Sequence, residues 1–233
     1  MRMGLAATAI AMAAGFVLAG TGLRAQKADL ASVLQQMDAS AGKFQDVTAN
    51  VKVDNYTAVV QDHEYQQGTT AFRRASGGME MVTHLKTLDG KAYADLLYRN
   101  GELDYYNPVQ KQETIIAAGA NKQEYDSFLA TGFGATGKEL SAAWTVTLMG
   151  MESIDGVQTA KLDLVSKDAR VRENFSHVQV WLDASRDISL KQVMVQPSGD
   201  SRTVTYSNVE YNTPVKSDLF KLDIPKGTPV QRR

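Results

Sequence analysis

Cysteine is absent from this chain of 233 residues, and its absence restricts both the fold and the mode of attachment. Without cysteine the chain forms no disulfide, so its stability must come from a buried core. A bacterial lipoprotein also needs a cysteine at its processed N-terminus to carry acyl chains of its own. We therefore expect a protein that has no lipid anchor.

Basic charge and histidine are also scarce. The chain has 25 Lys and Arg against 26 Asp and Glu, a formal net charge of −1. A nucleic-acid-binding domain is expected to show a clustered basic face, so this balance argues against nucleic acid as a partner. The three histidines, His63, His84 and His177, are scattered and lack metal-ligand spacing, so no metal site is expected.

Long apolar runs are missing except near the N-terminus, where one extends from Leu5 to Gly20 behind the charged Arg2. Small and polar residues follow it. This order is typical of a signal peptide, and the run is short for a membrane span. We expect residues 1–25 to be a cleaved signal peptide and 26–233 to be one exported domain with no permanent membrane anchor.

Hydrophobic periodicity predicts one helix followed by about eleven strands. Apolar residues recur at helical spacing within residues 28–44, and from Gln45 onward the period changes to two. Tight-turn signals such as Asn100-Gly101 join successive strands, which favours an antiparallel sheet. The expected strands are 45–54, 63–74, 78–86, 91–99, 102–106, 112–117, 144–151, 157–166, 175–183, 188–196 and 202–211.

The strand pattern is interrupted in the middle of the chain. Residues 120–131 and 138–143 have helical character, and the glycine-rich stretch between them predicts a loop. The charged residues 167–174 predict a loop or one helical turn, and 218–224 a short helix or strand. We expect these elements to form an α+β fold.

A sheet of this size curls, and its concave face must be covered. Two or three helices are available for a large apolar surface, so the interior is either filled by side chains or left with a cavity; periodicity allows both. The large residues expected on the concave face, and hence around any cavity, are Phe72, Met79, Met81, Tyr93, Leu97, Trp144, Leu148, Val180, Leu182 and Met194.

Several segments resemble the outer-membrane lipoprotein carrier (LolA-like) family. The first is 68–75, GTTAFRRA, and the second is the hairpin 100–108, NGELDYYNP. The polar segment 110–114 and the ending formed by 206–212, Phe220, 225–227 and Val230 are also similar to the family. The resemblance extends in one order from about residue 28 to 230.

The resemblance implies a half-open antiparallel β-barrel closed by a helical lid. It further implies a periplasmic carrier that takes up acyl chains of lipoproteins or lipids from an inner-membrane release complex and passes them to an outer-membrane acceptor. In the family an arginine at the end of the second strand bonds to the lid, and Arg74 occupies that position here. The alternative is a periplasmic lipid or lipoprotein sensor of the same fold that regulates a membrane partner.

Two positions depart from the family pattern. Ala75 stands where the family has proline, and Asp104 stands where it has an aromatic residue. A carboxylate is poorly placed against lipid. These two residues therefore bear on the identity of the cargo and on the movement of the lid.

The sequence contains no complete motif for nucleotide binding or catalysis. The segment 132–138 fits two phosphate-loop patterns, but Glu139 stands where a P-loop needs Ser or Thr, and a helical rather than a strand pattern precedes it. No nucleophile, base and orienting group appear together. We expect a monomeric binding protein that is not an enzyme and uses no cofactor.

Overall fold

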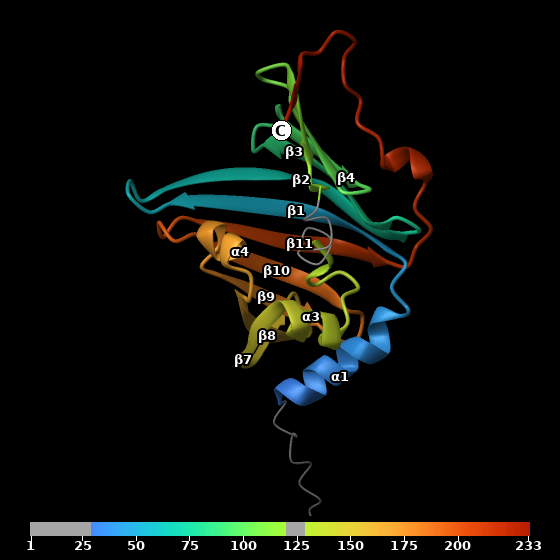
Figure 1. Cartoon of the computed structure of the whole chain (residues 1–233), viewed down its shortest axis with the longest axis vertical. Coiled ribbons are helices and arrows are strands. Elements are labelled where there is room, and N and C mark those ends of the chain that lie inside the picture. Colours follow the sequence, from blue (N-terminus) through green and yellow to red (C-terminus); the bar gives the residue numbers. More distant parts are fainter. Residues whose placement is uncertain (1–28, 120–128) are drawn as a thin grey trace, which may run out of the picture.

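The fold is an open sheet of twelve strands with short helices on one face (Figure 1). The computed structural model describes residues 29–119 and 129–233. The expected signal peptide and most of the expected helix at 120–131 lie outside these residues. Within them, no helix is long and apolar enough to cross a membrane.

The strands lie in the order β12-β6-β5-β4-β3-β2-β1-β11-β10-β9-β8-β7. All neighbouring strands are antiparallel except β12, which pairs with β6 in parallel. Their bounds are β1 Asp46–Thr57, β2 Asp62–Ala75, β3 Gly78–Thr87, β4 Ala92–Arg99, β5 Glu102–Asn107, β6 Gln112–Ala117, β7 Trp144–Ile154, β8 Val157–Ser166, β9 His177–Asp183, β10 Ile188–Val195, β11 Ser201–Tyr211 and β12 Val230–Arg232.

Alternation along β1 shows why these residues form a half-buried sheet. Val47, Ala49, Val51 and Val53 are buried, and the residues between them point to the opposite face. We call the buried side the inner face and the opposite side the outer face. The two ends of the sheet are far apart in the strand order and do not pair, so the barrel is half open as the resemblance implied.

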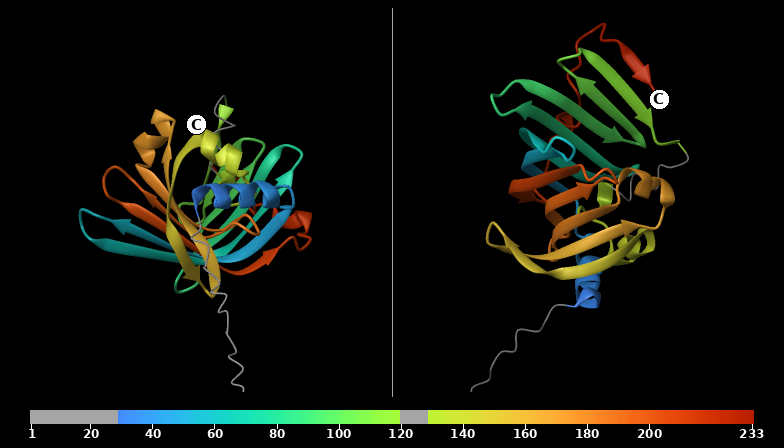
Figure 2. Two further views of the ribbon diagram at one scale, coloured as in Figure 1. Left: turned by 90° about the horizontal axis from the view of Figure 1, so that it is seen from below. Right: turned by 90° about the vertical axis from the view of Figure 1, so that its left-hand side faces the viewer.

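The described helices are α1 Leu30–Ala41, α3 Gly137–Ala143, α4 Ala169–Asn174 and the 3-10 turn η2 Ser217–Leu219. Asp29 caps α1 by accepting from the Ser32 amide, and Thr136 with Glu139 forms a capping box on α3. Figure 2 shows α1 and α3 together on the concave side of the sheet. They approach closely, because a Cβ at Gly137 would stand 2.4 Å from the Leu34 carbonyl oxygen.

The inner face is divided between two apolar clusters. The filled cluster lies where α1 and α3 cover β7 to β9, and its buried members include Val33, Met37, Leu140, Trp144, Leu162, Leu164, Val178, Val180 and Leu182. The hollow cluster centres on β1, β2, β3 and β11, and its buried members include Phe44, Val47, Val51, Val53, Phe72, Met79, Phe133, Ile188, Val204 and Tyr206. Met194 packs against both.

The outer face is covered in one region by the segment around η2. Phe220 is fully buried there against Ala71, Val82 and Leu97. The Arg73 guanidinium carbon lies 4.0 Å from the centre of the Phe220 ring, and the Arg99 side chain donates to the Phe220 carbonyl oxygen. This segment therefore docks through one aromatic anchor held by two cations.

All eleven expected strands are present, as are the helices at 30–41 and 137–143. The charged segment 167–174 contains α4, and 218–224 begins within the turn η2. The twelfth strand, β12, was not expected, because its three exposed residues show no alternation. The fold class predicted from the sequence, a half-open sheet with few helices, is confirmed.

Candidate functional site

A cavity of about 290 Å³ opens on the inner face in the region of the hollow cluster. Its walls come from seven strands and from the segment that precedes α3, and they are mostly apolar. The lining residues are Val51, Val53, Thr70, Phe72, Met81, Thr83, Leu96, Tyr98, Leu103, Leu129, Phe133, Gln192, Met194, Arg202, Val204 and Tyr206. Its size lies near the lower end of the range for ligand pockets, which is roughly 300–1,000 Å³.

Phe133 forms the wall at one end of the cavity. Its ring stacks on Phe72 with centroids 3.9 Å apart and meets Tyr206 edge-on at 5.2 Å. Phe133 belongs to a loop that is fastened to the sheet, because the Ser189 amide donates to the Gly132 carbonyl oxygen at 2.6 Å. The three rings and this bond fix that end of the cavity.

Gly132 is needed for the loop to approach the sheet. Its φ is +82°, in the left-handed region, and a Cβ there would stand 2.6 Å from the Ser189 Cβ. Both observations exclude a side chain at this position without strain. The glycines that resembled a phosphate loop therefore place an aromatic wall beside the sheet.

Arg74 connects this loop to α1. It extends from the end of β2, and its Nη2 donates to the Gly134 carbonyl oxygen at 2.6 Å and to the Ala41 carbonyl oxygen at 3.4 Å. The loop residue Gly134 follows the expected lid helix by only three residues. The structure thus places the Arg74 side chain between the end of α1 and the loop that contains Gly134.

Asp187 lies close to Arg74 and is fully buried. Neither carboxylate oxygen has a hydrogen-bond partner among the described residues. Burial raises the pKa of Asp187 to about 8, although the Arg74 charge opposes that shift, and the carboxylates of Glu139 and Asp38 add to it. A carboxyl group that is protonated at neutral pH therefore stands where the loop, α1 and the sheet meet.

Polar groups inside the cavity are few and mostly paired. The Tyr206 hydroxyl donates to Gln192 Oε1 at 3.3 Å, and Gln192 Nε2 donates to the Thr131 carbonyl oxygen at 3.0 Å. Arg202 contributes the only guanidinium among the lining residues of this described cavity. The apolar walls with a small number of placed polar groups are suited to an amphipathic ligand.

The structure separates nine of the ten predicted lining residues into three groups. Phe72, Met81 and Met194 line the cavity. Met79 and Tyr93 pack within or against the hollow cluster without lining the cavity. Trp144, Leu148, Val180 and Leu182 belong to the filled cluster under α1 and α3.

Leu97 was expected on the concave face, and this placement was wrong. It packs on the outer face against Phe220. The pairing of β3 with β4 shifts between Leu85 and Lys86, which leaves Tyr93 as an extra residue in β4. This bulge puts Tyr93 and Leu97 on opposite faces although their spacing is even.

Asp104 does not face the cavity. It pairs with Leu97 across β4 and β5 and therefore shares the outer face, whereas its neighbour Leu103 lines the cavity. Burial raises the pKa of Asp104, and Glu102 adds to the effect. The departure from the family pattern at this position consequently leaves the inner wall apolar.

Sequence reasoning missed Phe133, Leu96, Leu103 and Arg202 as lining residues. Arg202 could have been found, because Val204 and Tyr206 alternate with it along β11 and all three line the cavity. Phe133 could not, because only the tertiary contact with Ile188 brings its loop over the sheet.

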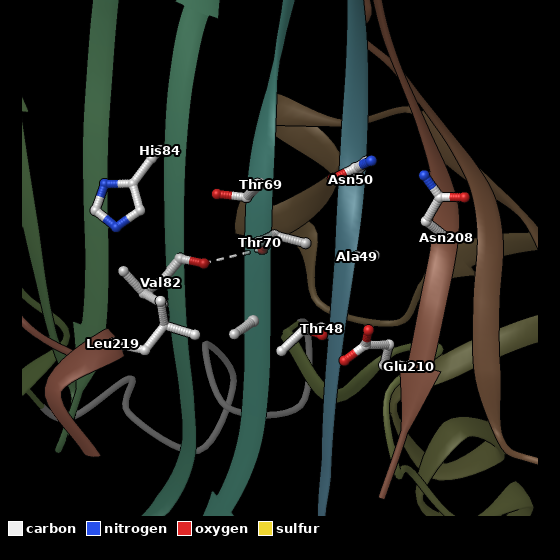
Figure 3. Close-up of a pocket in the computed structure, with 11 residues that line it drawn as sticks. Thr48, Ala49, Asn50, Thr69, Thr70, Val82, His84, Asn208, Glu210 and Leu219 are labelled. Atoms are coloured by element: carbon white, nitrogen blue, oxygen red, sulfur yellow. Dashed lines mark hydrogen bonds between the residues drawn. The ribbon is translucent and has the colours of Figure 1, made fainter. Parts of the chain in front are cut away.

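The outer face also has a hollow, whose lining carries a larger share of polar groups than the inner cavity does (Figure 3). Thr48, Asn50, Thr69, His84, Asn208 and Glu210 point into it, and Leu219 borders it from η2. Its hydroxyl, amide and carboxylate groups favour water over an acyl chain. The inner cavity is therefore the candidate site.

Each histidine bonds to an aspartate on a neighbouring strand, which the sequence did not reveal. The Nδ1–Oδ1 distances are 2.7 Å for His63 with Asp54, 2.7 Å for His84 with Asp95 and 2.6 Å for His177 with Asp163. The described residues contain no group of three or more potential metal ligands. These pairs act as cross-strand contacts within the sheet.

Comparisons with solved structures found several similar proteins. An uncharacterized conserved protein from Thermus thermophilus is similar with a TM-score of 0.52 at 12% identity, and the match covers 87% of this chain and 98% of that one. The MucA/MucB complex of Pseudomonas aeruginosa is similar with a TM-score of 0.46 at 15% identity, and the match covers 84% of this chain and 61% of that chain. A LolA superfamily protein from Nitrosomonas europaea is similar with a TM-score of 0.41 at 14% identity, and the match covers 84% of this chain and 99% of that chain.

At these identities the likenesses concern the fold alone, and no curated protein matches the chain. The open antiparallel sheet with helices on its inner face is the architecture that the sequence resemblance implied. The model of the MucB/RseB N-terminal domain matches residues 41–219, most of the chain, and the chain belongs to that family.

Proposed function

We propose that this protein is a periplasmic carrier that holds an acyl chain of a lipid or lipoprotein in the inner cavity and moves it toward the outer membrane. In this proposal residues 1–25 direct export and are removed, and residues 26–233 act as one monomeric domain. The protein works by binding, without catalysis. The observation that carries the proposal is the apolar cavity beside the loop that Arg74 holds.

Burial of an acyl chain supplies the driving force. Each methylene group removed from water contributes about 0.8 kcal/mol. The walls formed by Phe72, Met81 and Met194 offer apolar surface for this purpose. A carrier must also release its cargo, and a loop held by a few polar bonds allows open and closed states that differ by only a few kcal/mol.

The partners in this proposal are a release complex at the inner membrane and an acceptor at the outer membrane. They come from the resemblance to lipoprotein carriers. Arg74 would hold the lid shut during transit through its bond to the Gly134 carbonyl oxygen. Rearrangement of that contact would accompany delivery.

A pair of matched variants tests the proposal. Thr83→Phe adds a ring inside the cavity, whereas Thr205→Phe adds one on the outer side of β11, opposite Lys52. Native mass spectrometry after gentle purification should show retained acyl ligand in the wild type and in Thr205→Phe, and a large loss in Thr83→Phe. A wild-type protein that neither retains nor accepts any acyl ligand would refute the proposal.

A second candidate function is sensing. It is favoured by family membership and by the structure of a MucB relative in complex with MucA. This chain spans 61% of the length of that MucB chain. In this alternative the bound lipid changes the affinity for a membrane-bound regulator.

Affinity purification from envelope extract separates the two functions. A stoichiometric membrane regulator that leaves when lipid is added supports the sensor. Transfer of labelled lipoprotein between inner and outer membrane vesicles supports the carrier. Thr83→Phe serves as the lipid-deficient control in both assays.

A further inference from the structure

We propose that the cavity selects a single acyl chain that ends in a carboxylate, a fatty acid anion, and that Arg202 binds the carboxylate. The inference rests on the proposed function, because it specifies which amphiphile the same cavity takes. It is carried by the position of Arg202, by its lack of a partner and by the size of the cavity.

Arg202 lies on the inner face among apolar side chains. It stands in β11 opposite Met194 of β10, and it shares its face with Val204. Burial lowers the pKa of the guanidinium, yet an arginine remains charged at physiological pH. A cation in such surroundings is costly unless an anion or hydrogen-bond acceptor meets it.

Among the described residues, no ion pair or hydrogen bond satisfies the Arg202 side chain; its neighbours act only through longer-range electrostatics. The Tyr206, Tyr93 and Tyr105 hydroxyls and the Glu64 carboxylate act on the guanidinium electrostatically and oppose the lowering of its pKa. Glu64 is exposed and accepts from the Tyr93 hydroxyl at 3.3 Å. The guanidinium is therefore available to a ligand.

Arg202 and Phe72 lie apart along the strands that line the cavity, with Tyr206 between them. Arg202 pairs with Asn55 of β1, whereas Phe72 pairs with Val47, eight residues away along the same strand. At about 3.3 Å per residue this is roughly 26 Å of strand. A chain whose carboxylate meets Arg202 would therefore point its tail toward Phe72.

The volume favours one chain. The cavity of about 290 Å³ is roughly twice the size of an engineered cavity that accepts benzene. One chain with bends fits such a space better than the paired chains of a phospholipid. The planar guanidinium matches the two oxygens of a carboxylate.

Binding of palmitate and of 1-hexadecanol, which has the same number of carbons and no charge, tests the inference. Tryptophan fluorescence or native mass spectrometry at pH 7.5 gives both affinities. The wild type should prefer palmitate by about tenfold or more, since hydrogen bonds to charged groups are the stronger class. Arg202→Met should lose this preference and still bind hexadecanol.

Two further variants separate charge from folding. Arg202→Lys should retain part of the preference. Lys52→Met removes one positive charge from an exposed site on the outer side of β1 and should keep the full preference. Arg202→Met should melt at the wild-type temperature or above it, because it removes an unpaired cation from an apolar wall.

The outcomes distinguish this inference from the proposed function. If the wild type binds neither ligand, the acyl-binding function itself fails. If it binds both ligands equally, or if Arg202→Met keeps the preference for palmitate, binding stands and the assignment of Arg202 is overturned.

Discussion

The two halves of the inner face use the same alternation of strand residues but are covered differently. Under α1 and α3, the helices supply Met37 and Leu140, which fill the space above Leu162. Over β1 and β2, the loop that contains Phe133 covers the sheet among the described residues, and a cavity remains beside it. Residual space on this sheet is thus set by what covers each half rather than by the apolar content of its strands.

The largest expected difference between the halves is in stability. Leu162→Ala leaves a hole in a packed region where the side chain is fully buried, so the free energy of unfolding should fall by about 2–5 kcal/mol. Met81→Ala borders an existing cavity and should cost clearly less. Urea unfolding of both variants measures this, and equal losses would show that the second half is filled in solution.

The next effect concerns Asp187, where the two halves meet. The pKa of its carboxyl is about 8 in the folded protein and near the ordinary value of 3.8 in the unfolded chain, so the folded state binds the proton more tightly. This contribution to stability is complete below about pH 4 and is lost as the pH rises to about 8. The free energy of unfolding of Asp187→Asn should therefore exceed that of the wild type by a few kcal/mol at about pH 8 and equal it at about pH 4.

Asp183→Asn is the matched control for that pH dependence. Burial alone would raise the pKa of Asp183, but hydrogen bonds from Ser185 and Arg186 outweigh it and lower the pKa. The stability that Asp183 contributes is present above its ordinary pKa and lost on acidification. Chemical denaturation from about pH 3 to about pH 8 should show that the effect of Asp187→Asn grows as the pH rises above about 4, whereas the effect of Asp183→Asn changes only at the acidic end. Parallel trends for the two variants would contradict the assignment.

A smaller effect is expected where the loop is fastened over the hollow half. Gly132→Ala forces a Cβ against Ser189 at a positive φ and should cost about 1–2 kcal/mol. The filled half should be unaffected. Hydrogen exchange should therefore rise at the Ser189 amide while the amides of β8 keep their protection, and uniform loss of protection would argue against a local role.

Removal of the Arg74 contact should have the smallest effect. Arg74→Leu loses the bonds to Gly134 and Ala41, and we expect release of bound acyl ligand to accelerate a few-fold while uptake changes little. Stopped-flow transfer to acceptor vesicles measures both rates. Arg74→Lys keeps the charge, so its release rate should lie between those of Arg74→Leu and the wild type. Equal release rates in Arg74→Leu and the wild type would contradict the lid assignment.

Strand content could be predicted from the sequence because each long strand buries one side. In β1 the alternation of Val51 and Val53 with polar residues is enough to define its face. The face of Leu97 could not be predicted, because a bulge at Tyr93 changes the parity of β4 without a signal in the sequence. Local periodicity thus predicts which residues alternate, and the register decides where they point.

The site was predicted only in part for a related reason. Phe72 and Met81 lie on strands whose faces alternation defines, and both line the cavity. Trp144 is equally large and equally buried, yet α1 and α3 cover its region. Where a helix packs on a sheet depends on contacts between distant segments, so the division into filled and hollow halves had no counterpart in the sequence pattern.

A sheet that does not close into a barrel keeps two outer strands, and unpaired strand edges tend to pair with strands of neighbouring molecules. At one border β12 lies along β6, and the Glu113 and Ala117 amides donate to the Pro229 and Arg233 carbonyl oxygens. At the other border the pairing of β7 is broken by an irregularity at Gly150, which hinders the addition of a further strand. The short strand Val230–Arg232 thereby covers part of an exposed edge of the open sheet, which should hinder edge-to-edge association between molecules.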